Sequence, residues 1–117
     1  KIINFQNNPY PYINKSDLFI LTSKYEGLPN VLLEAAVLKK FIISSDCPTG
    51  PKEILLNGKG GFLFKEGNFK DLSNKILKFA KNKKNLKPKI NYNYKNLIRF
   101  DFYKNLNKYY NAINKLL

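Results

Sequence analysis

Three short apolar runs, separated by segments of helical character, constrain the fold of this chain more than any other feature. The runs are Leu18–Leu21, residues 41–43 and Phe62–Phe64, and residues 30–38 between the first two are mostly apolar or strong helix formers. Leu18–Leu21 is apolar at every position, as a strand covered on both faces of a parallel sheet requires. The alternation of strand and helix predicts an α/β fold, with helices on the faces of a parallel sheet.

Further elements are predicted on both sides of these runs. Ile2, Ile3 and Phe5 indicate a short strand that ends before Pro9. Pro29 fits the first position of the helix expected over residues 30–38. Residues 83–89 read as a basic connector broken by Pro88. The expected helices or helical turns are 10–15, 52–56, 67–82, 92–100 and 102–117, with the last two forming an amphipathic pair packed on the sheet.

The length of 117 residues, 44% of them apolar, fits one folded domain over residues 1–117. We expect residues 1–82 to hold the sheet and its motifs, and residues 83–117 to hold C-terminal helices. A chain of this size buries roughly 65% of its unfolded surface, so one core can form without disulfides or metal.

The rare residue types exclude several kinds of site. The chain has no histidine and one cysteine, Cys47. This excludes a disulfide framework, a zinc site of Cys and His, and catalysis by histidine, and it favours a packing role for Cys47. No apolar run reaches the ~20 residues needed to span a bilayer. Because the sequence begins at Lys1 without a signal-like stretch, we expect a piece of a longer, cytoplasmic protein.

Positive charge is concentrated in the second half of the chain. The net charge is +13, and residues 67–117 hold 13 of the 21 basic and 2 of the 8 acidic residues. The Lys, Asn and Ile bias of an AT-rich coding sequence would produce this composition. The functional alternatives are binding to an anionic membrane surface or to nucleic acid. Arg99 is the only arginine, which argues against specific base reading.

Glu34 lies in the middle of an otherwise apolar helical segment. A helix that is apolar nearly all round should be buried, and a carboxylate there is costly unless it is hydrogen-bonded, paired or facing a cleft. Two interpretations follow. Glu34 either reaches water at a helix edge or lies at the rim of a cleft, where it accepts hydrogen bonds from hydroxyl groups.

The segment before this helix supplies a second carboxylate and a seat for an anion. Glu26 precedes Gly27, which permits a tight turn, and the amides at the start of the helix carry partial positive charge. Phosphates bind at such helix N-termini. Two carboxylates with an anion seat between them suit a ligand with central phosphates and hydroxyls at both ends, which is the shape of a nucleoside-diphosphate sugar.

These residues resemble a known family. Glu26 and Glu34 match the paired-glutamate motif of family 4 retaining glycosyltransferases with the GT-B fold. The surrounding blocks, SDLFILTSKYEGLPNVLLEA over residues 16–35, SDCPTGPKEIL over residues 45–55 and GGFLF over residues 60–64, are similar to that family as well. The resemblance covers about residues 1–80 and implies a Rossmann-like domain, the C-terminal half of a GT-B fold, truncated at its N-terminal side.

The resemblance implies a role for each matching residue. Glu34 would accept hydrogen bonds from the ribose hydroxyls of the donor. Glu26, the candidate catalytic residue, would contact the hydroxyls of the donor sugar. Residues 5–8 would lie near the nucleobase, and no cofactor or metal would be required. The backbone around the start of the helix would seat the diphosphate through Gly27, Leu28, Asn30 and Val31.

The resemblance also implies a whole-protein activity. A bacterial hexosyltransferase would move a hexose or N-acetylhexosamine from a UDP-sugar, with retention, to a cell-surface glycan or lipid-linked acceptor at the cytoplasmic membrane face. In this fold the last helix often crosses to the other domain, so part of its apolar stripe would pack there in the whole protein. The phosphate-binding arginine and lysine of the family and its N-terminal acceptor domain have no match in this sequence. We therefore expect donor binding without turnover from this chain. The alternatives are a lysine-rich module that binds nucleic acid or an anionic surface without catalysis, and a degenerate scaffold.

Overall fold

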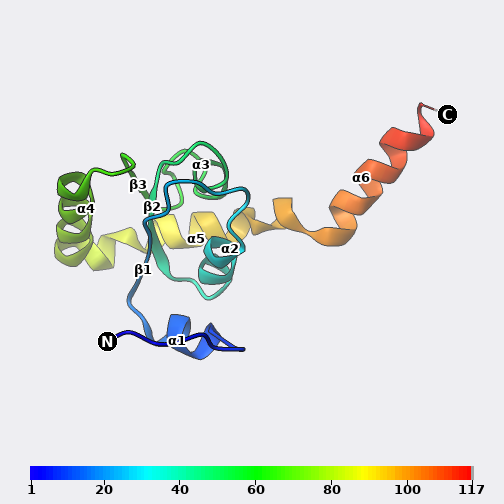
Figure 1. The fold of residues 1–117 in the computed structure, drawn as a ribbon. Helices are drawn as coiled ribbons and strands as arrows, with labels where there is room; N and C mark the ends of the chain where they lie inside the picture. The colour runs from blue at the N-terminus through cyan, green and yellow to red at the C-terminus, as the bar shows by residue number, and fades with distance from the viewer. Residues whose placement is uncertain (117) are drawn as a thin grey trace.

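A three-stranded parallel sheet forms the centre of the molecule (Figure 1). The computed structural model describes residues 1–116 and places the strands in the order β1 (Leu18–Leu21), β2 (Phe41–Ser45), β3 (Phe62–Phe64). Leu18 lies opposite Phe41, and Ile43 lies opposite Phe62. The predicted α/β class is confirmed, and β2 runs two residues further than its apolar run indicates, through Ser45.

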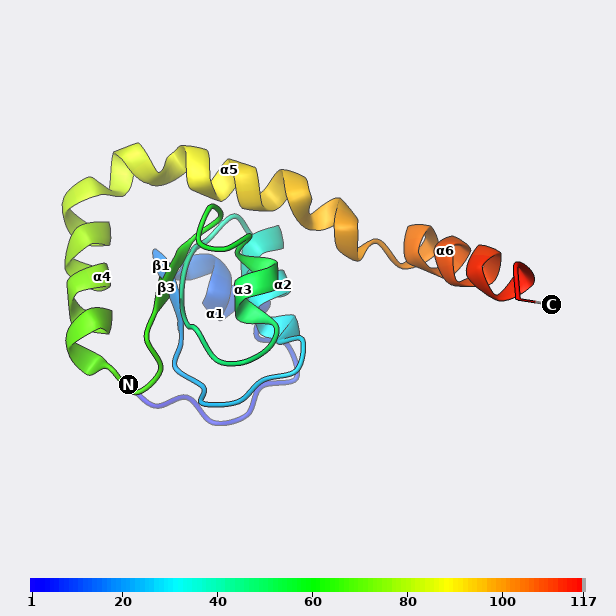
Figure 2. The ribbon, with the colours of Figure 1, turned by 90° about the horizontal axis from the view of Figure 1, so that it is seen from above.

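Helices cover both faces of this sheet. Figure 2 shows α4 on one side of the strands and α2 with α3 on the other. Helix α5 connects the two sides, whereas α6 projects away from the rest of the molecule (Figures 1 and 2). The helices are α1 (Tyr10–Lys15), α2 (Asn30–Val37), α3 (Pro51–Ile54), α4 (Phe69–Asn82), α5 (Lys87–Asn96) and α6 (Phe102–Asn114), with 3-10 turns η1 (Lys83–Leu86) and η2 (Leu97–Phe100).

The central strand divides the core into two clusters. All five residues of β2 are buried, and successive side chains point to opposite faces of the sheet. Ile42 packs with Leu32 and Ala35 of α2, together with the leucine and isoleucine side chains of the α3 region. Phe41 and Ile43 pack on the other face, in a cluster completed by Phe62, Phe64, Phe79 and Leu86. This two-sided burial is what the apolar strand runs predict.

The predicted N-terminal strand is wrong. Residues 1–9 form no helix or strand, and the side chains of Ile2 and Phe5 are 95% and 89% exposed. A strand needs a neighbour for its backbone donors and acceptors, and within the described residues β1 pairs only with β2. An apolar run without a pairing partner does not become a strand.

Two proline positions also differ from the prediction. Pro29 is not the first helical residue but the N-cap of α2, with an extended ψ of 100°, and its carbonyl accepts from the amide of Leu32 at 2.9 Å. Pro88 does not break a connector, because it lies in the first turn of α5, where a missing amide N–H costs no helical hydrogen bond. Residues 83–89 are therefore helical throughout.

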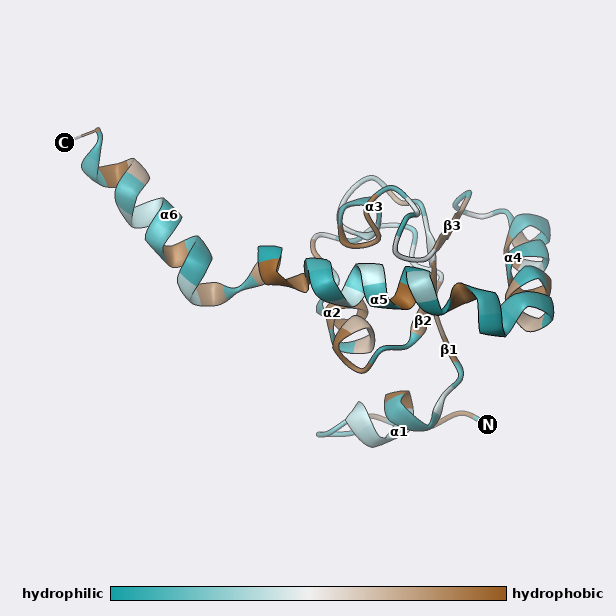
Figure 3. Cartoon of the chain, turned by 180° about the vertical axis from the view of Figure 1, so that it is seen from behind, coloured by the Kyte–Doolittle hydropathy of each residue, from teal (hydrophilic) through white to brown (hydrophobic). Residues whose placement is uncertain are grey.

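The last helix does not pack on the sheet as expected. Helix α5 does pack on the domain, and its Asn93 is buried against Gly60. In contrast, α6 has no buried residue, and its apolar stripe, visible in Figure 3, is exposed at Tyr103, Leu106, Tyr110 and Ile113. Asp101 adopts an extended conformation between η2 and α6 and directs the helix away. Leu117, the predicted end of the stripe, lies outside the described residues.

Phe41 is the aromatic centre of the α4-side cluster, and its removal should destabilise the domain strongly. Its ring lies 4.8 Å from that of Phe62 and 5.3 Å from that of Phe79, between centroids. We expect Phe41→Ala to lower the free energy of unfolding by about 3–5 kcal/mol, because it leaves a cavity. Phe102→Ala, at a ring 69% exposed on α6, should change it by less than about 0.5 kcal/mol. Urea denaturation measures both, and equal losses would contradict this account of the core.

Candidate functional site

The loops that follow the three strands meet at one edge of the sheet, because parallel strands end at the same side. We call this side the carboxyl edge; it carries residues 22–29, 46–50 and 65–68. The first of these loops contains Glu26 and leads directly into α2, which contains Glu34. In open α/β sheets, ligands bind outside the carboxyl ends of the strands, so this edge is the first place to look for a site.

Helix α2 buries only one of its two apolar faces. Leu32, Ala35 and Ala36 are buried against the sheet. The opposite face lies over an open pocket of about 600 Å³, lined by Tyr10, Asn30, Leu33, Glu34, Val37 and Leu38. The expectation of a fully buried helix is therefore wrong for this outer face, and Val37 there is 57% exposed. Apolar residues left uncovered around a carboxylate make a surface suited to a ligand with apolar and hydroxyl parts.

Glu34 lies in this pocket rather than in the core. Its side chain is half-buried, and among the described residues its carboxylate makes no hydrogen bond and no ion pair. Its oxygens are therefore available to accept hydrogen bonds from a ligand. Glu34 therefore lines an open pocket, where its carboxylate also reaches water, and its hydrogen bonding to a ligand stays a prediction.

The other predicted site residues surround the start of α2 without lining this pocket. Glu26 is half-buried, Gly27 and Leu28 are exposed, and Val31 is partly buried against the core. Asn30 is the only one of them that shares the pocket with Glu34. The start of α2 has no side-chain cap, because the residue at the cap position is Pro29. The first amides of the helix are thus not taken up by a capping side chain.

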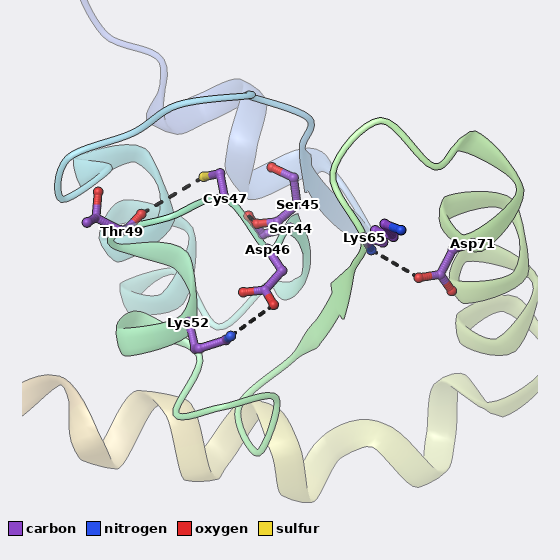
Figure 4. Close-up of polar contacts among 8 residues, drawn as sticks. All are labelled: Ser44, Ser45, Asp46, Cys47, Thr49, Lys52, Lys65 and Asp71. Atoms are coloured by element: carbon purple, nitrogen blue, oxygen red, sulfur yellow. Dashed lines mark hydrogen bonds and ion pairs between the residues drawn. The ribbon is translucent and has the colours of Figure 1, made fainter.

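The end of β2 and the loop 46–50 are hydrogen-bonded to the turn that contains Glu26. The hydroxyl of Ser45 donates to the carbonyl of Ser23 at 2.6 Å, and the hydroxyl of Thr49 donates to the carbonyl of Glu26. Figure 4 shows Ser45, the last residue of β2, and Thr49, in the loop that follows it. The partners are separated by 22 positions in the first bond and by 23 in the second. The end of β2 and the loop after it therefore fix the backbone conformation of the turn that contains Glu26.

Gly50 makes the closest contact between the two loops. Its φ of +86° is in the left-handed region. A Cβ atom at this position would lie 2.1 Å from the carbonyl oxygen of Gly27 and 2.4 Å from Cδ of Pro29. No side chain fits there, so the turn before α2 can approach α3 only because residue 50 is glycine.

Other charged residues near this edge have structural partners. The ammonium of Lys52 pairs with the carboxylate of Asp46 at 3.0 Å (Figure 4), so each neutralises the other. Asp71 accepts from the amide of Lys65 at 3.1 Å and thereby ties the start of α4 to the end of β3. Cys47 is buried, as a packing residue should be.

Sequence reasoning missed three residues that build the site. Tyr10 lines the pocket opposite α2, and its amide donates to the side chain of Asn8 at 3.1 Å. A tyrosine in a short helix before a strand carries no signal of its own. Thr49 and Gly50 were read as loop residues, because their contacts to the Glu26 turn depend on long-range packing that no local pattern reveals.

Comparison with known proteins shows which family the chain belongs to. Residues 1–97 match the family model described as "Glycosyl transferases group 1". The chain is 30% identical over 92 residues to the capsular polysaccharide biosynthesis glycosyltransferase CapM of Staphylococcus aureus, a match that covers 79% of this chain and 24% of CapM.

Two solved structures have the same fold. HepE of Anabaena, in complex with UDP, superposes with a TM-score of 0.79 at 21% identity, over 89% of this chain and 29% of HepE. TarM superposes with a TM-score of 0.80 at 26% identity, over 94% of this chain and 22% of TarM. The fold is therefore that of GT-B glycosyltransferases. The chain spans less than a third of the length of each of these proteins.

Replacement of Gly50 should be far more costly than replacement of Gly67. Both have a positive φ, +86° and +72°, but a Cβ at Gly67 would have no atom within 4 Å. Gly67→Ala should lower the free energy of unfolding by about 1–2 kcal/mol, from backbone strain alone. Gly50→Ala should lower it by roughly 2–5 kcal/mol, because the clash is added to the strain. Equal losses in denaturant titrations would show that the two loops are not in tight contact.

Proposed function

Because the chain belongs to the glycosyl transferases group 1 family, we propose that it is the donor-binding domain of a retaining, family 4 type glycosyltransferase. The observation that carries this proposal is the position of Glu34. It is a carboxylate without a partner among the described residues, in a pocket on the outer face of α2 and close to an uncapped helix start. This combination offers hydrogen-bond acceptors for a ribose next to backbone donors for a diphosphate.

We assign each predicted site residue to the ribose, the diphosphate or the sugar of the donor, according to its position along α2 and the turn before it. Glu34, which lies one turn inside α2 from Asn30, accepts hydrogen bonds from the ribose hydroxyls. The amides of Asn30 and Val31 and the turn at Gly27 and Leu28 bind the diphosphate, since negative charge is stabilised at the start of a helix. Glu26, on the turn held by Thr49, contacts the hydroxyls of the transferred sugar.

Tyr10 extends this arrangement beyond the ribose. It lines the same pocket as Glu34, and its ring is 47% exposed. Tyr10 follows residues 5–8, which we propose to lie near the nucleobase. An exposed aromatic ring at this position offers a flat apolar surface for a base.

The comparisons supply support for the donor and for the pathway. HepE is solved with UDP, and CapM is named for capsular polysaccharide biosynthesis. We propose accordingly that the donor is a UDP-hexose or UDP-N-acetylhexosamine and that no metal or other cofactor takes part. The acceptor is a cell-surface glycan or a lipid-linked precursor, and the protein is cytoplasmic and bacterial.

The chain alone should bind the donor without turning it over. It corresponds to 24% of CapM and 29% of HepE, and the proposed roles of its residues all concern the donor. An acceptor-binding part of the same protein would supply the second substrate. We propose the same hexosyl transfer, with retention, for that whole protein.

Glu34→Gln should weaken UDP binding by roughly 10- to 100-fold. The variant keeps the shape of the side chain but removes its charge, and a hydrogen bond to a charged group contributes about 1.5–3 kcal/mol, against about 0.5–1.5 kcal/mol for a neutral one. Removing a negative charge near the site would by itself strengthen the binding of an anionic ligand. Weaker binding of UDP by the variant would therefore identify direct contact between UDP and Glu34. Isothermal titration calorimetry of the 117-residue chain with UDP measures the change.

Glu66→Gln is the matched control for this experiment. Glu66 is exposed on the loop after β3, at the same edge of the sheet, and lies outside the pocket that contains Glu34. It loses the same charge, and we expect UDP affinity to stay within about twofold of the unmodified chain, as for a surface group without contact to the ligand. Tight UDP binding by Glu34→Gln, with both variants equally stable, would refute the ribose assignment.

A further inference from the structure

The edge of the sheet opposite the candidate site is strongly basic. All three strands begin at this edge, and the residues just before them include Lys15, Lys39, Lys40 and Lys59. Asp17, immediately before β1, is the one acidic residue in these turns. We call this side of the molecule the amino-edge face.

Helices α4 and α5 bring many more lysines to the same face. The end of α4, the turn η1 and the start of α5 lie there, as three contacts demonstrate. Lys83 of η1 pairs with Asp17 at 2.5 Å, and Lys89 of α5 donates to the carbonyl of Gly58, before β3, at 2.7 Å. The ammonium of Lys39 lies 4.5 Å from the ring centroid of Tyr94, on α5. Figure 2 shows α5 running along this side of the sheet.

Asp71, in the first turn of α4, is the one acidic residue of these helices, and it lies 3.9 Å from the ammonium of Lys75. The rest of this segment, residues 72–100, contains eight lysines and Arg99, and neither aspartate nor glutamate. At the amino edge itself, Asp17 already has Lys83 as its partner, and the hydrogen bond from Lys83 lowers the pKa of Asp17. The amino-edge face therefore carries a large uncompensated positive charge.

Three of the lysines are held close together around one aromatic ring. The ammonium groups of Lys75, Lys78 and Lys89 lie 6.0, 5.3 and 6.0 Å from the ring centroid of Phe62. Burial, and then the charge of Lys78, lower the pKa of Lys89. Like charges gathered in this way repel each other, and phosphate groups at the surface would relieve the repulsion.

Acidic residues are concentrated on the other side of the domain. Glu26, Asp46, Glu66 and Asp71 all belong to the carboxyl edge or to the start of α4 next to it. Lysines such as Lys24, Lys52 and Lys65 lie on that side as well, so its charge is nearly balanced, whereas lysine predominates on the amino-edge face. The amino-edge face is therefore a different surface from the nucleotide site.

We propose that the amino-edge face binds the anionic surface of a lipid bilayer, with the carboxyl edge pointing away from the lipid. Lysine ammonium groups attract phosphate headgroups as point charges and need no fixed geometry for this. Nucleic acids are read mainly by arginine, and the guanidinium of Arg99 is occupied by the carbonyl groups of Glu53 and Asn96. A sugar nucleotide arriving from water would reach its pocket unhindered in this orientation, which, of the two proposed acceptors, suits a glycan that extends from the membrane into water.

Membrane binding by the amino-edge face differs from membrane binding by α6, the helix that projects from the domain. Lys104 and Lys108 of α6, and Lys115 at its C-cap, lie on the side of that helix opposite its apolar stripe, by their spacing in the sequence. If the apolar stripe entered a membrane, α6 would lie in the interface and these lysines would contribute to binding through the anionic headgroups. Membrane contact through the amino-edge face, in contrast, predicts no large role for the lysines of α6.

Vesicle binding by two triple variants tests the proposal. Lys81, Lys84 and Lys87 are exposed on the amino-edge face and make no ion pair with any of residues 1–116. Their joint replacement by glutamine should lower binding to vesicles that contain phosphatidylglycerol by about 100-fold, since each lysine near such a surface contributes about 1 kcal/mol. The matched control, Lys104→Gln with Lys108→Gln and Lys115→Gln, loses the same charge and should lower binding by less than about tenfold. Cosedimentation measures both.

Three outcomes would overturn the proposal. Equal losses in the two variants would show that net charge alone attracts the chain, without a defined face. Binding that ignores phosphatidylglycerol content, or no binding at all, would exclude the anionic surface as the partner. Salt-sensitive binding to duplex DNA without binding to vesicles would assign the face to nucleic acid instead. Because UDP binding is measured separately, failure here leaves the donor assignment intact.

Discussion

Burial of β2 on both faces is the constraint on which the rest of the structure depends. A parallel strand with every residue buried requires a helical layer on each side, and this places α2 and α3 on one face and α4 on the other. Because α2 uses Leu32, Ala35 and Ala36 to cover the sheet, its opposite face turns outward. Glu34 stands on that outward face, so the packing that builds the core also positions the carboxylate in the pocket.

Contacts from the end of β2 and the loop 46–50 fix the position of the turn before α2. Thr49 and Ser45 hold the backbone of the first loop through their hydroxyl groups, and Gly50 allows the turn at Gly27 to approach α3. Glu26 is mounted on this turn and Glu34 on the helix that follows it. The proposed donor site is therefore a product of two loops and one helix, whose relative positions are fixed by backbone contacts rather than by the charged side chains themselves.

Local patterns in the sequence were sufficient to place the strands. The runs Leu18–Leu21 and Phe62–Phe64 became strands with the predicted bounds. The expected cover on both faces is wrong for β1, because this strand lies at an edge of the sheet, is only partly buried and exposes Ile20. The same patterns failed where tertiary partners decide. Ile2 and Phe5 lack a neighbouring strand, α6 follows an extended Asp101 away from the sheet, and Pro29 is set by packing against Gly50. Glu26 and Glu34 were found through a motif, whereas Tyr10 and Thr49 could be found only through contacts between distant segments.

The central claim is that a nucleotide binds at the outer face and start of α2. Amide chemical-shift mapping by NMR during a titration of the chain with UDP tests it most directly, because every backbone N–H reports its own surroundings. The account predicts the largest shifts at Gly27, Leu28, Asn30, Val31 and Glu34, with a further shift at Tyr10, and small shifts in α4 and α5. Shifts centred on the lysines of η1 and α5, or the absence of any shift at saturating UDP, would contradict it.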